Sequence, residues 1–443
     1  MNGWGQPMEV PPEPPQVRVN GWMIRLNTFR RAVETCRADV LPYTWVDSET
    51  NCFTVPPPEA LSAARVVVTT CAACPLLQRL AVLPGHFSLI IIDEAAQALE
   101  PEVLLTLALA GPKTRSMMAG DWRQLGPVVR SPAADSLGLG KSLMERLSHT
   151  AQYKKNAALL VKLKHNYRSH PGLLTLPSSL FYQDQLVASA NPIVTHSLLP
   201  AAGFLAGFGA SNSNFSDADG DVEPVATDTP LLFYGVQGRE LSEDDTPSFF
   251  NRVEAVVVCS LIQLLIKSHL KVSPSQIGVI APYRKQVQKV RLLLREYDLD
   301  SVRVGTVDDY QGQEEKVVLL STTLSNTERL ASDQDSSVGF LNNPRRFNVA
   351  LTRAKALCIV VGNPLVMLAR PHWRALLHHC LRTRSYAGCP PPPECGVEGE
   401  ELGEDAFLRI MEERLLGAGD EPASGEKVLE RSFRDEQEFR VII

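Results

Sequence analysis

The sequence lacks a long apolar run, a leader-like start, a regular cysteine pattern and any internal repeat of fixed period. No apolar run reaches the roughly 20 residues that a membrane-spanning helix needs. Residues 1–16 hold neither the basic segment nor the apolar core of a secretory signal. The nine cysteines are odd in number and widely scattered, which favours a reducing compartment. We therefore expect neither a membrane protein nor a disulfide-stabilised secreted module.

The chain has no net positive charge, and its acidic excess is local. The net charge of −6 over 443 residues arises at the C-terminus, where residues 396–443 hold 14 acids and 6 bases. The rest of the chain, with 38 bases and 36 acids, is nearly neutral. This balance gives no direct sign of nucleic-acid binding, but a local basic groove would be sufficient for it. The length, with 44% apolar and 21% charged residues, predicts a globular protein of two or three domains.

Short apolar runs alternate with helix-like segments, which predicts α/β domains built on parallel sheets. We assign residues 1–60 to a Pro- and Gly-rich start and a remnant of the first domain, 61–156 to the core of that domain, 157–389 to a second domain and 390–443 to an acidic tail. The expected strands are Ala64–Thr70, Phe87–Ile92, Arg115–Ala119, Leu159–Leu163, Leu231–Tyr234, Ile277–Ala281, Arg303–Thr306, Val317–Thr322 and Leu357–Val361. The expected helices include Val253–Lys267, Arg284–Glu296 and Arg346–Arg353.

Two carboxylates follow the apolar run Phe87–Ile92. Such a run predicts a strand that is buried on both faces, with a ligand site at its C-terminal end. There, Asp93 is suited to holding Mg²⁺ through water, and Glu94 to orienting and deprotonating a water molecule in nucleotide hydrolysis. For these two residues alone, a solvated acidic turn is the alternative.

A Gly-Asp turn, Gly120-Asp121, follows the next expected strand, and Gln124 comes shortly after it. A glutamine beside the acidic pair would be able to sense a γ-phosphate and orient water. An ordinary Gly/Pro turn is the alternative.

Three further side chains suit nucleotide contacts in the second domain. Tyr167 can stack on a base, and Arg168 can clamp a phosphate with two hydrogen bonds. Arg353, if it projects towards a nucleotide, would act as an arginine finger. For each arginine, a surface or salt-bridged side chain is the alternative.

The segment Gly305–Glu314 holds another candidate pair. Gly312 allows a close backbone approach, and Glu314 is able to accept a hydrogen bond from a ribose hydroxyl. A plain strand-to-helix turn is the alternative.

These segments, in this order, are far more specific than any one of them. The chain resembles superfamily-one RNA helicases of the nonsense-decay type, and within them the Moloney leukaemia virus ten (Armitage) branch. The resemblance covers about residues 17–390 and implies two RecA-like parallel-sheet domains, the first truncated at its N-terminus. The residues that carry the closer match are Leu125–Ser131, Lys164–Pro171, Pro247–Asn251, Pro282–Val287, Gly305–Glu314 and Phe340–Asn363.

The resemblance also implies ligands and roles. ATP and Mg²⁺ would be the cofactors, with Asp93 on the metal, Glu94 as base and Gln124 as γ-phosphate sensor. Tyr167 would stack on adenine, while Arg168 and Arg353 would contact the γ-phosphate. The remaining implied nucleotide-binding residues are Gly120, Asp121, Gly312 and Glu314. The implied RNA-facing residues are Thr69, Thr70, Pro282, Tyr283, Arg284 and Thr306, which would mostly read the backbone.

The implied partners and place of action are single-stranded RNA, traversed 5′ to 3′, silencing proteins of the Argonaute type, and cytoplasmic RNA granules (P-bodies). No membrane is implied.

One part of the family pattern is missing. No Gly-x-x-x-x-Gly-Lys-Ser/Thr loop lies between Met1 and Leu89. The nearest match, Asp135–Ser142, begins with Asp, follows no buried strand and comes after Gln124, so we reject it as a phosphate loop. We therefore expect the C-terminal part of a longer helicase, whether as a fragment, a splice form, an incomplete gene model or a truncated paralogue. A catalytically inactive RNA- or protein-binding module and a DNA-directed superfamily-one helicase are the alternatives.

Overall fold

The structure is a computed structural model that describes Leu61 and residues 64–199, 229–243, 248–268, 272–326 and 339–395. The expected start at residues 1–60 and most of the acidic tail lie outside these residues. The chain divides into two units, which we call the N-unit (Met1–Ile90 and Leu105–Arg115) and the sheet unit (Ile91–Leu104 and Ser116–Ile443). Among the described residues, no helix has the length and apolarity that crossing a membrane requires.

The first part of the chain holds a two-stranded sheet of β1 (Leu89–Ile92) and β2 (Arg115–Met118). The prediction that β1 is buried on both faces is wrong, because Leu89 and Ile91 are 51% and 56% exposed while Ile90 and Ile92 are buried. One face of the strand is covered and the other is not.

The strand expected at Ala64–Thr70 is also wrong. This segment is irregular, and Val68 is 92% exposed. Among the described residues no strand pairs with it, and an isolated strand has no partners for its backbone hydrogen bonds. The elements that follow before residue 165 are η2 (Cys71–Ala73), α3 (Cys74–Arg79), α4 (Glu100–Leu107), α5 (Pro132–Ser136), α6 (Leu143–Ser148) and α7 (Ala151–Lys154).

The sheet unit is built on six parallel strands in the order β12-β5-β11-β10-β8-β9. This arrangement confirms the α/β prediction for the second domain, including its last five strands and three helices to within a few residues. The strands are β5 (Leu231–Gly235), β8 (Ile277–Ile280), β9 (Arg303–Gly305), β10 (Glu315–Ser321), β11 (Ala354–Gly362) and β12 (Tyr386–Gly388). The helices around them are α8 (Pro171–Phe181), α9 (Pro192–Thr195), α11 (Arg252–Lys267), α12 (Arg284–Glu296), α14 (Pro344–Leu351), α15 (Pro364–Leu368) and α16 (Pro371–Arg382).

The strand expected at Leu159–Leu163 is wrong. Those residues are irregular, with Leu163 89% exposed, and the strand at that place is the shorter β3 (His165–Asn166), which pairs with β4 (Val187–Ala188). The remaining short elements are the antiparallel pair β6 (Glu240–Ser242) and β7 (Phe249–Asn251), with η3 (Pro274–Gln276) and η4 (Pro393–Cys395).

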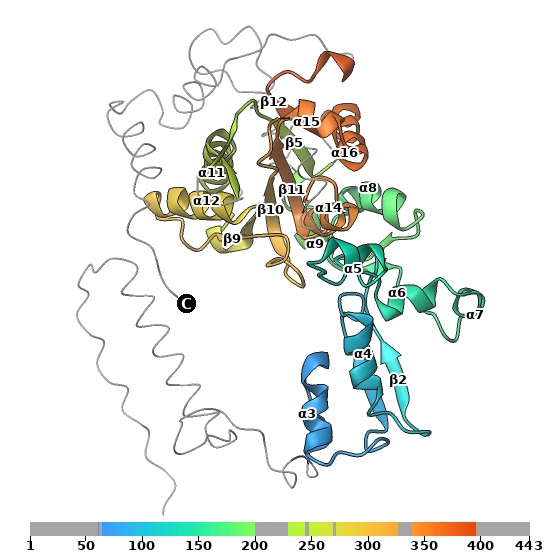
Figure 1. Ribbon diagram of the computed structural model, residues 1–443. Coiled ribbons are helices and arrows are strands. Elements are labelled where there is room, and N and C mark those ends of the chain that lie inside the picture. The colour runs from blue at the N-terminus through green and yellow to red at the C-terminus, as the bar shows by residue number, and fades with distance from the viewer. Residues whose placement is uncertain are drawn as a thin grey trace, which may run out of the picture. The chain divides into compact units, whose positions relative to one another are not determined.

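Alternate strand residues enter two different cores. Val317 and Leu319 of β10 pack with α11 and α12, whereas Val318 and Leu320 pack with α14, α15 and α16. Figure 1 shows these two sets of helices on opposite faces of the sheet. Both faces are therefore covered, which explains why the strands are continuous apolar runs without alternation.

The common direction of the strands separates the candidate residues into two groups. Glu314 and Arg353 directly precede β10 and β11, at the N-terminal edge of the sheet. Arg284 begins α12 shortly after β8 ends, and Thr306 directly follows β9, so both lie at the C-terminal edge. A strand as long as β10 spans roughly 20 Å, so these two groups lie about that far apart.

A buried polar network supports the C-terminal edge. Glu254, at the start of α11, is fully buried, and its carboxylate accepts hydrogen bonds from Ser321 Oγ at 2.6 Å and from the Thr323 amide at 2.7 Å. Gln286, in the first turn of α12, donates to the same Ser321 Oγ at 3.0 Å. The turn that carries Arg284 is thus joined to the end of β10 through side chains that water does not reach.

Burial raises the pKa of Glu254 to about 7, although the hydrogen bonds from Ser321 and Thr323 act in the opposite direction. A raised pKa means that the folded state favours the protonated acid. Its contribution to stability is therefore present below about pH 4.5 and is lost as the pH rises through about 7.

We predict that Glu254→Gln removes this dependence on pH. Between pH 5 and pH 8, the wild-type sheet unit should lose roughly 2–3 kcal/mol of unfolding free energy relative to the variant. Urea unfolding at both pH values measures the difference. Glu296→Gln makes the same change on an exposed side chain of α12 and should show no such trend, and equal behaviour of the two variants would contradict the prediction.

Candidate functional site

The acidic turn after β1 is hydrogen-bonded to the turn after β2. The Ala119 amide donates to Ile92 O at 2.9 Å, and the Ala95 amide donates to Ala119 O at 2.8 Å. Glu94, between these two bonds, has a φ of 50°, in the left-handed region that non-glycine residues rarely adopt. Such strained positions are frequent at functional sites. Gly120 is confined as well, because a Cβ there would lie 3.0 Å from the Ala96 amide nitrogen.

The two carboxylates have local partners. Asp93 Oδ1 accepts from the Glu94 amide at 3.0 Å, and Glu94 Oε2 accepts from Gln97 Nε2 at 2.7 Å. Oxygen ligands at a strand end suit Mg²⁺, so the donor set is compatible with the metal role expected of Asp93.

Gln124 is oriented through Asp121. Asp121 Oδ2 accepts from Gln124 Nε2 at 3.1 Å and from the Tyr182 hydroxyl at 2.6 Å. Asn348 of α14 donates both to Tyr182 Oη at 2.8 Å and to Arg123 O at 3.0 Å. Burial and the Asp121 carboxylate raise the pKa of Tyr182, which keeps its hydroxyl a donor. Neither Tyr182 nor Asn348 was predicted as a site residue.

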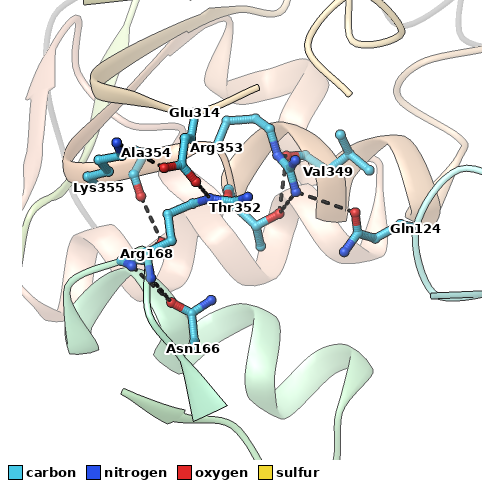
Figure 2. Close-up of polar contacts among 10 residues, drawn as sticks. Gln124, Asn166, Arg168, Glu314, Val349, Thr352, Arg353, Ala354 and Lys355 are labelled. Carbon is cyan, nitrogen blue, oxygen red and sulfur yellow. Dashed lines mark hydrogen bonds and ion pairs between the residues drawn. The ribbon is translucent and has the colours of Figure 1, made fainter. Parts of the chain in front are cut away.

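Arg353 lies directly after α14 and is only 2% exposed. Its Nε donates to Val349 O at 2.9 Å, and its Nη2 donates to Thr352 Oγ1 at 2.9 Å and to Gln124 Oε1 at 3.4 Å, as Figure 2 shows. All three acceptors are neutral, and within the described ranges no salt bridge holds this guanidinium. Burial, followed by the neighbouring charge of Arg168, lowers the pKa of Arg353 to about 10, so the group is still a cation at neutral pH. A buried cation without a paired anion is costly, which makes this place suitable for a phosphate.

Arg168 and Glu314 contact each other (Figure 2). Arg168 Nε lies 2.5 Å from Glu314 Oε2, and its Nη1 donates to Thr352 O at 3.0 Å. Lys355 holds the other carboxylate oxygen of Glu314 at 2.9 Å. The hydrogen bonds from Arg168 and then Lys355 lower the pKa of Glu314. The turn before Glu314 depends on Gly312, whose φ of +70° favours glycine.

Tyr167 lies beside these groups in the sequence but turns its ring to solvent. The ring is 75% exposed and lies nearly parallel to His165, with 6.2 Å between centroids. An exposed aromatic face of this kind is available for stacking.

The residues expected to face RNA fall into two places. Arg284 is exposed, Tyr283 packs edge-on against Phe249, and the Thr306 hydroxyl donates to Asp309 Oδ2 at 2.8 Å, all at the C-terminal edge. Pro282 is buried just after β8. Thr69 and Thr70 are exposed and belong to the N-unit, where Thr70 Oγ1 accepts from the Ala73 amide at 3.3 Å and caps η2.

Two protein families match parts of the chain. Residues 139–365, more than half of the chain, match a family described as an AAA domain, and residues 28–132 match a second family with the same description. The human protein named RNA helicase Mov10l1 is 42% identical over 352 residues, which are 75% of this chain and 27% of that protein. The Gallus gallus protein named putative helicase MOV-10 is 39% identical over 86% of this chain and 40% of its own length.

The Drosophila melanogaster protein named probable RNA helicase armi is 32% identical over 74% of this chain and 28% of its own length. The solved structure titled "The structure of PRRSV helicase" is 17% identical over 63% of this chain and 35% of that one, with a TM-score of 0.28, too low to add to the assignment.

The parallel sheet and the two matched domains define a superfamily-one helicase with AAA-type helicase domains. Within that class, the chain belongs to the branch of RNA helicases that contains Mov10l1, MOV-10 and Armitage. Nucleotide use and nucleic-acid binding are what this family suggests. The chain spans 27% to 40% of the length of the three relatives described above.

We predict that Tyr182→Phe destabilises the sheet unit by about 1–2 kcal/mol, because it removes the hydrogen bond to the Asp121 carboxylate. Tyr167→Phe is the matched control and should stay within about 0.5 kcal/mol of wild type, since its ring is exposed. Urea unfolding of the three proteins tests this, and equal midpoints for the two variants would contradict it.

Proposed function

We propose that this chain is the part of an RNA helicase that grips single-stranded RNA and completes the site for ATP hydrolysis. The observation that carries this proposal is Arg353, a buried cation without a salt bridge that is held against Gln124. A group in that state is suited to the charge of a transferring phosphoryl group, which is the role of an arginine finger. Movement 5′ to 3′ along RNA is part of the proposal by family resemblance.

The first proposed roles belong to side chains in the turns that follow β1 and β2. Asp93 would hold Mg²⁺ through water, Glu94 would take the proton of the attacking water, and Gln124 would orient that water. Bound Mg²⁺ supplies neutralisation of the phosphate charge. Gly120 and Asp121 shape the turn that presents Gln124.

Arg168 is proposed as the second phosphate contact and Tyr167 as the adenine stack. To reach a phosphate, Arg168 would exchange its contact with Glu314 for the nucleotide, which would leave Glu314 with Lys355 and able to accept from a ribose hydroxyl. The turn at Gly312 permits this approach.

At the C-terminal edge, Pro282, Tyr283, Arg284 and Thr306 are proposed to contact the RNA backbone. Thr69 and Thr70, which belong to the N-unit, are proposed as RNA-backbone contacts of that unit. Cytoplasmic RNA granules and silencing proteins of the Argonaute type are proposed as place and partners by family resemblance alone.

A catalytically inactive RNA- or protein-binding module is the second candidate. One sequence observation favours it, namely the absence of a Gly-x-x-x-x-Gly-Lys-Ser/Thr motif between Met1 and Leu89. That loop supplies the backbone amides, the lysine and the hydroxyl that hold the β- and γ-phosphates.

We predict that residues 1–443, expressed alone, show no RNA-stimulated ATPase activity, because the loss of even one donor of such a site typically costs about 3–4 kcal/mol in the transition state. Phosphate release with excess RNA measures this, with Glu94→Gln as the background. Turnover above that background would refute the prediction.

The same assay distinguishes the two candidate functions in a chimera that adds the phosphate-loop segment of a relative. The helicase proposal expects restored turnover. In the active chimera, Arg353→Ala should lower kcat more than it raises KM, whereas Tyr167→Ala should raise KM more than it lowers kcat. A folded chimera without turnover would favour the inactive module.

We predict that the chain binds single-stranded RNA of any sequence weakly, with an affinity that falls steeply as salt rises. Arg284→Ala should reduce the dependence of log K on log salt by roughly 0.7, the share of one phosphate contact on a single strand. Arg382→Ala, an exposed arginine on the opposite edge of the sheet, should leave it unchanged. Fluorescence anisotropy with RNA and matched DNA oligomers measures both, and a preference for DNA would favour the DNA-directed alternative.

A further inference from the structure

The first turn of α14 carries two adjacent arginines that are held on different flanks. Arg345 Nη2 lies 2.9 Å from Glu145 Oε2 of α6, with both side chains largely buried. Arg346 makes a two-pronged pair with Asp308, at 2.9 and 3.2 Å. Asn343 caps the helix by accepting from both arginine amides, so the two guanidinium groups start from a fixed backbone.

The residues around the Arg345 guanidinium, Gly126 on one side and Glu145 on the other, hold it closely. A Cβ built on Gly126 would collide with Arg345 Nη1, so the guanidinium would have to shift from its present position if residue 126 carried a side chain. On the other side, Glu145 is fixed in the first turn of α6, where Ser142 Oγ, which is fully buried, caps its amide at 3.2 Å. The loop at Gly126 and helix α6 therefore enclose the side chain of Arg345 from two sides.

Two further contacts join α14 to the same loop. Asn348, one turn after Arg345, donates to Arg123 O, and Arg353 donates to Gln124 Oε1. Residues three and four apart share one face of a helix, so Arg345 and Asn348 both face the loop that contains Arg123 and Gly126. The Arg345–Glu145 contact is the one among these three in which both partners are charged, and charge-assisted bonds are the stronger kind.

We propose that Arg345, seated on Gly126 and paired with Glu145, is a positioning residue that fixes the approach of Arg353 to Gln124. It acts through α14 and touches none of the reacting groups. This inference rests on the proposed function, in which Arg353 and Gln124 face the same phosphate. It adds a contact that sets the geometry of that pair before any nucleotide arrives.

The test uses the full chain without nucleotide and reads Arg353 directly. Phenylglyoxal modifies accessible guanidinium groups, and mass spectrometry of the peptide across Arg353 reports its rate of modification. Arg345→Ala should raise that rate by roughly tenfold, as expected when a local opening equilibrium loses one charge-assisted contact. Amide hydrogen exchange across residues 120–130 should rise in parallel.

Matched variants separate positioning from general loosening. Arg346→Ala breaks the ion pair on the other flank of the same turn and should leave the Arg353 rate near wild type. Gly126→Ala should raise the Arg353 rate in the same direction but by less than Arg345→Ala, because the added methyl group shifts the guanidinium without removing it. The exchanged pair Arg345→Glu with Glu145→Arg should restore protection of Arg353.

An unchanged Arg353 rate in Arg345→Ala, or equal increases in Arg345→Ala and Arg346→Ala, would overturn the proposal. If circular dichroism shows that Arg345→Ala does not fold, the rate of Arg353 modification in Gly126→Ala is used instead, and an unchanged rate in that variant would overturn the proposal. The readout needs no nucleotide, so an inactive chimera would refute the proposed function while leaving this result standing.

Discussion

Six parallel strands buried on both faces determine which side chains of the sheet unit can meet. Because β10 and β11 are neighbours with the same direction, the residues that precede them, Glu314 and Arg353, come to one edge. By the same rule the residues that follow β8 and β9 come to the other edge. Strand order and strand direction therefore determine the edge of the sheet at which each of these side chains lies.

At the N-terminal edge, the guanidinium of Arg353 is buried without a salt bridge in the described part of the chain, and the packing of the sheet does not require a charge there. Arg168 and Lys355 are paired with Glu314, whereas Arg353, the most buried of the three cations, has no salt bridge within the described residues. Burying a charge in this way costs free energy that a structural ion pair would avoid. The arrangement is understandable if an anion completes it, and a phosphate carries the required charge and oxygen geometry. Burial is the main cause of the lowered pKa of Arg353, with the Arg168 charge second, while the charges of Glu94 and Glu314 act in the opposite direction.

Much of this fold could be predicted from the sequence, and the failures have a common cause. The helix Arg284–Glu296 and the five strands expected between Leu231 and Val361 were predicted correctly because their neighbours are present and cover both faces, whereas β6, β7 and β12 were not expected. Ala64–Thr70 and Leu159–Leu163 have the same apolar, β-branched character, yet no strand lies beside them within the described part of the chain. An apolar run indicates that a segment favours a strand, but not whether a neighbouring strand is present to pair with it.

The candidate site shows the same limit. Gln124 and Arg353 were expected at one site, and the structure places them in contact. Tyr182, Asn348 and the Arg345–Glu145 pair were missed because their partners lie 61, 225 and 200 residues away in the chain. Tyrosine, asparagine and arginine are common residues, and no local spacing marks those that will meet. Only Gly126 carried a signal, as a glycine in a turn, and that signal did not reveal which side chain required the space.

The opposite placement of the two edges has a mechanical consequence. A close-packed sheet resists bending, so a tilt imposed at the N-terminal edge must reappear at the C-terminal edge as displacement rather than as internal rearrangement. Glu314 and Arg353 at one edge and Arg284 and Thr306 at the other therefore move together when the sheet tilts as one body.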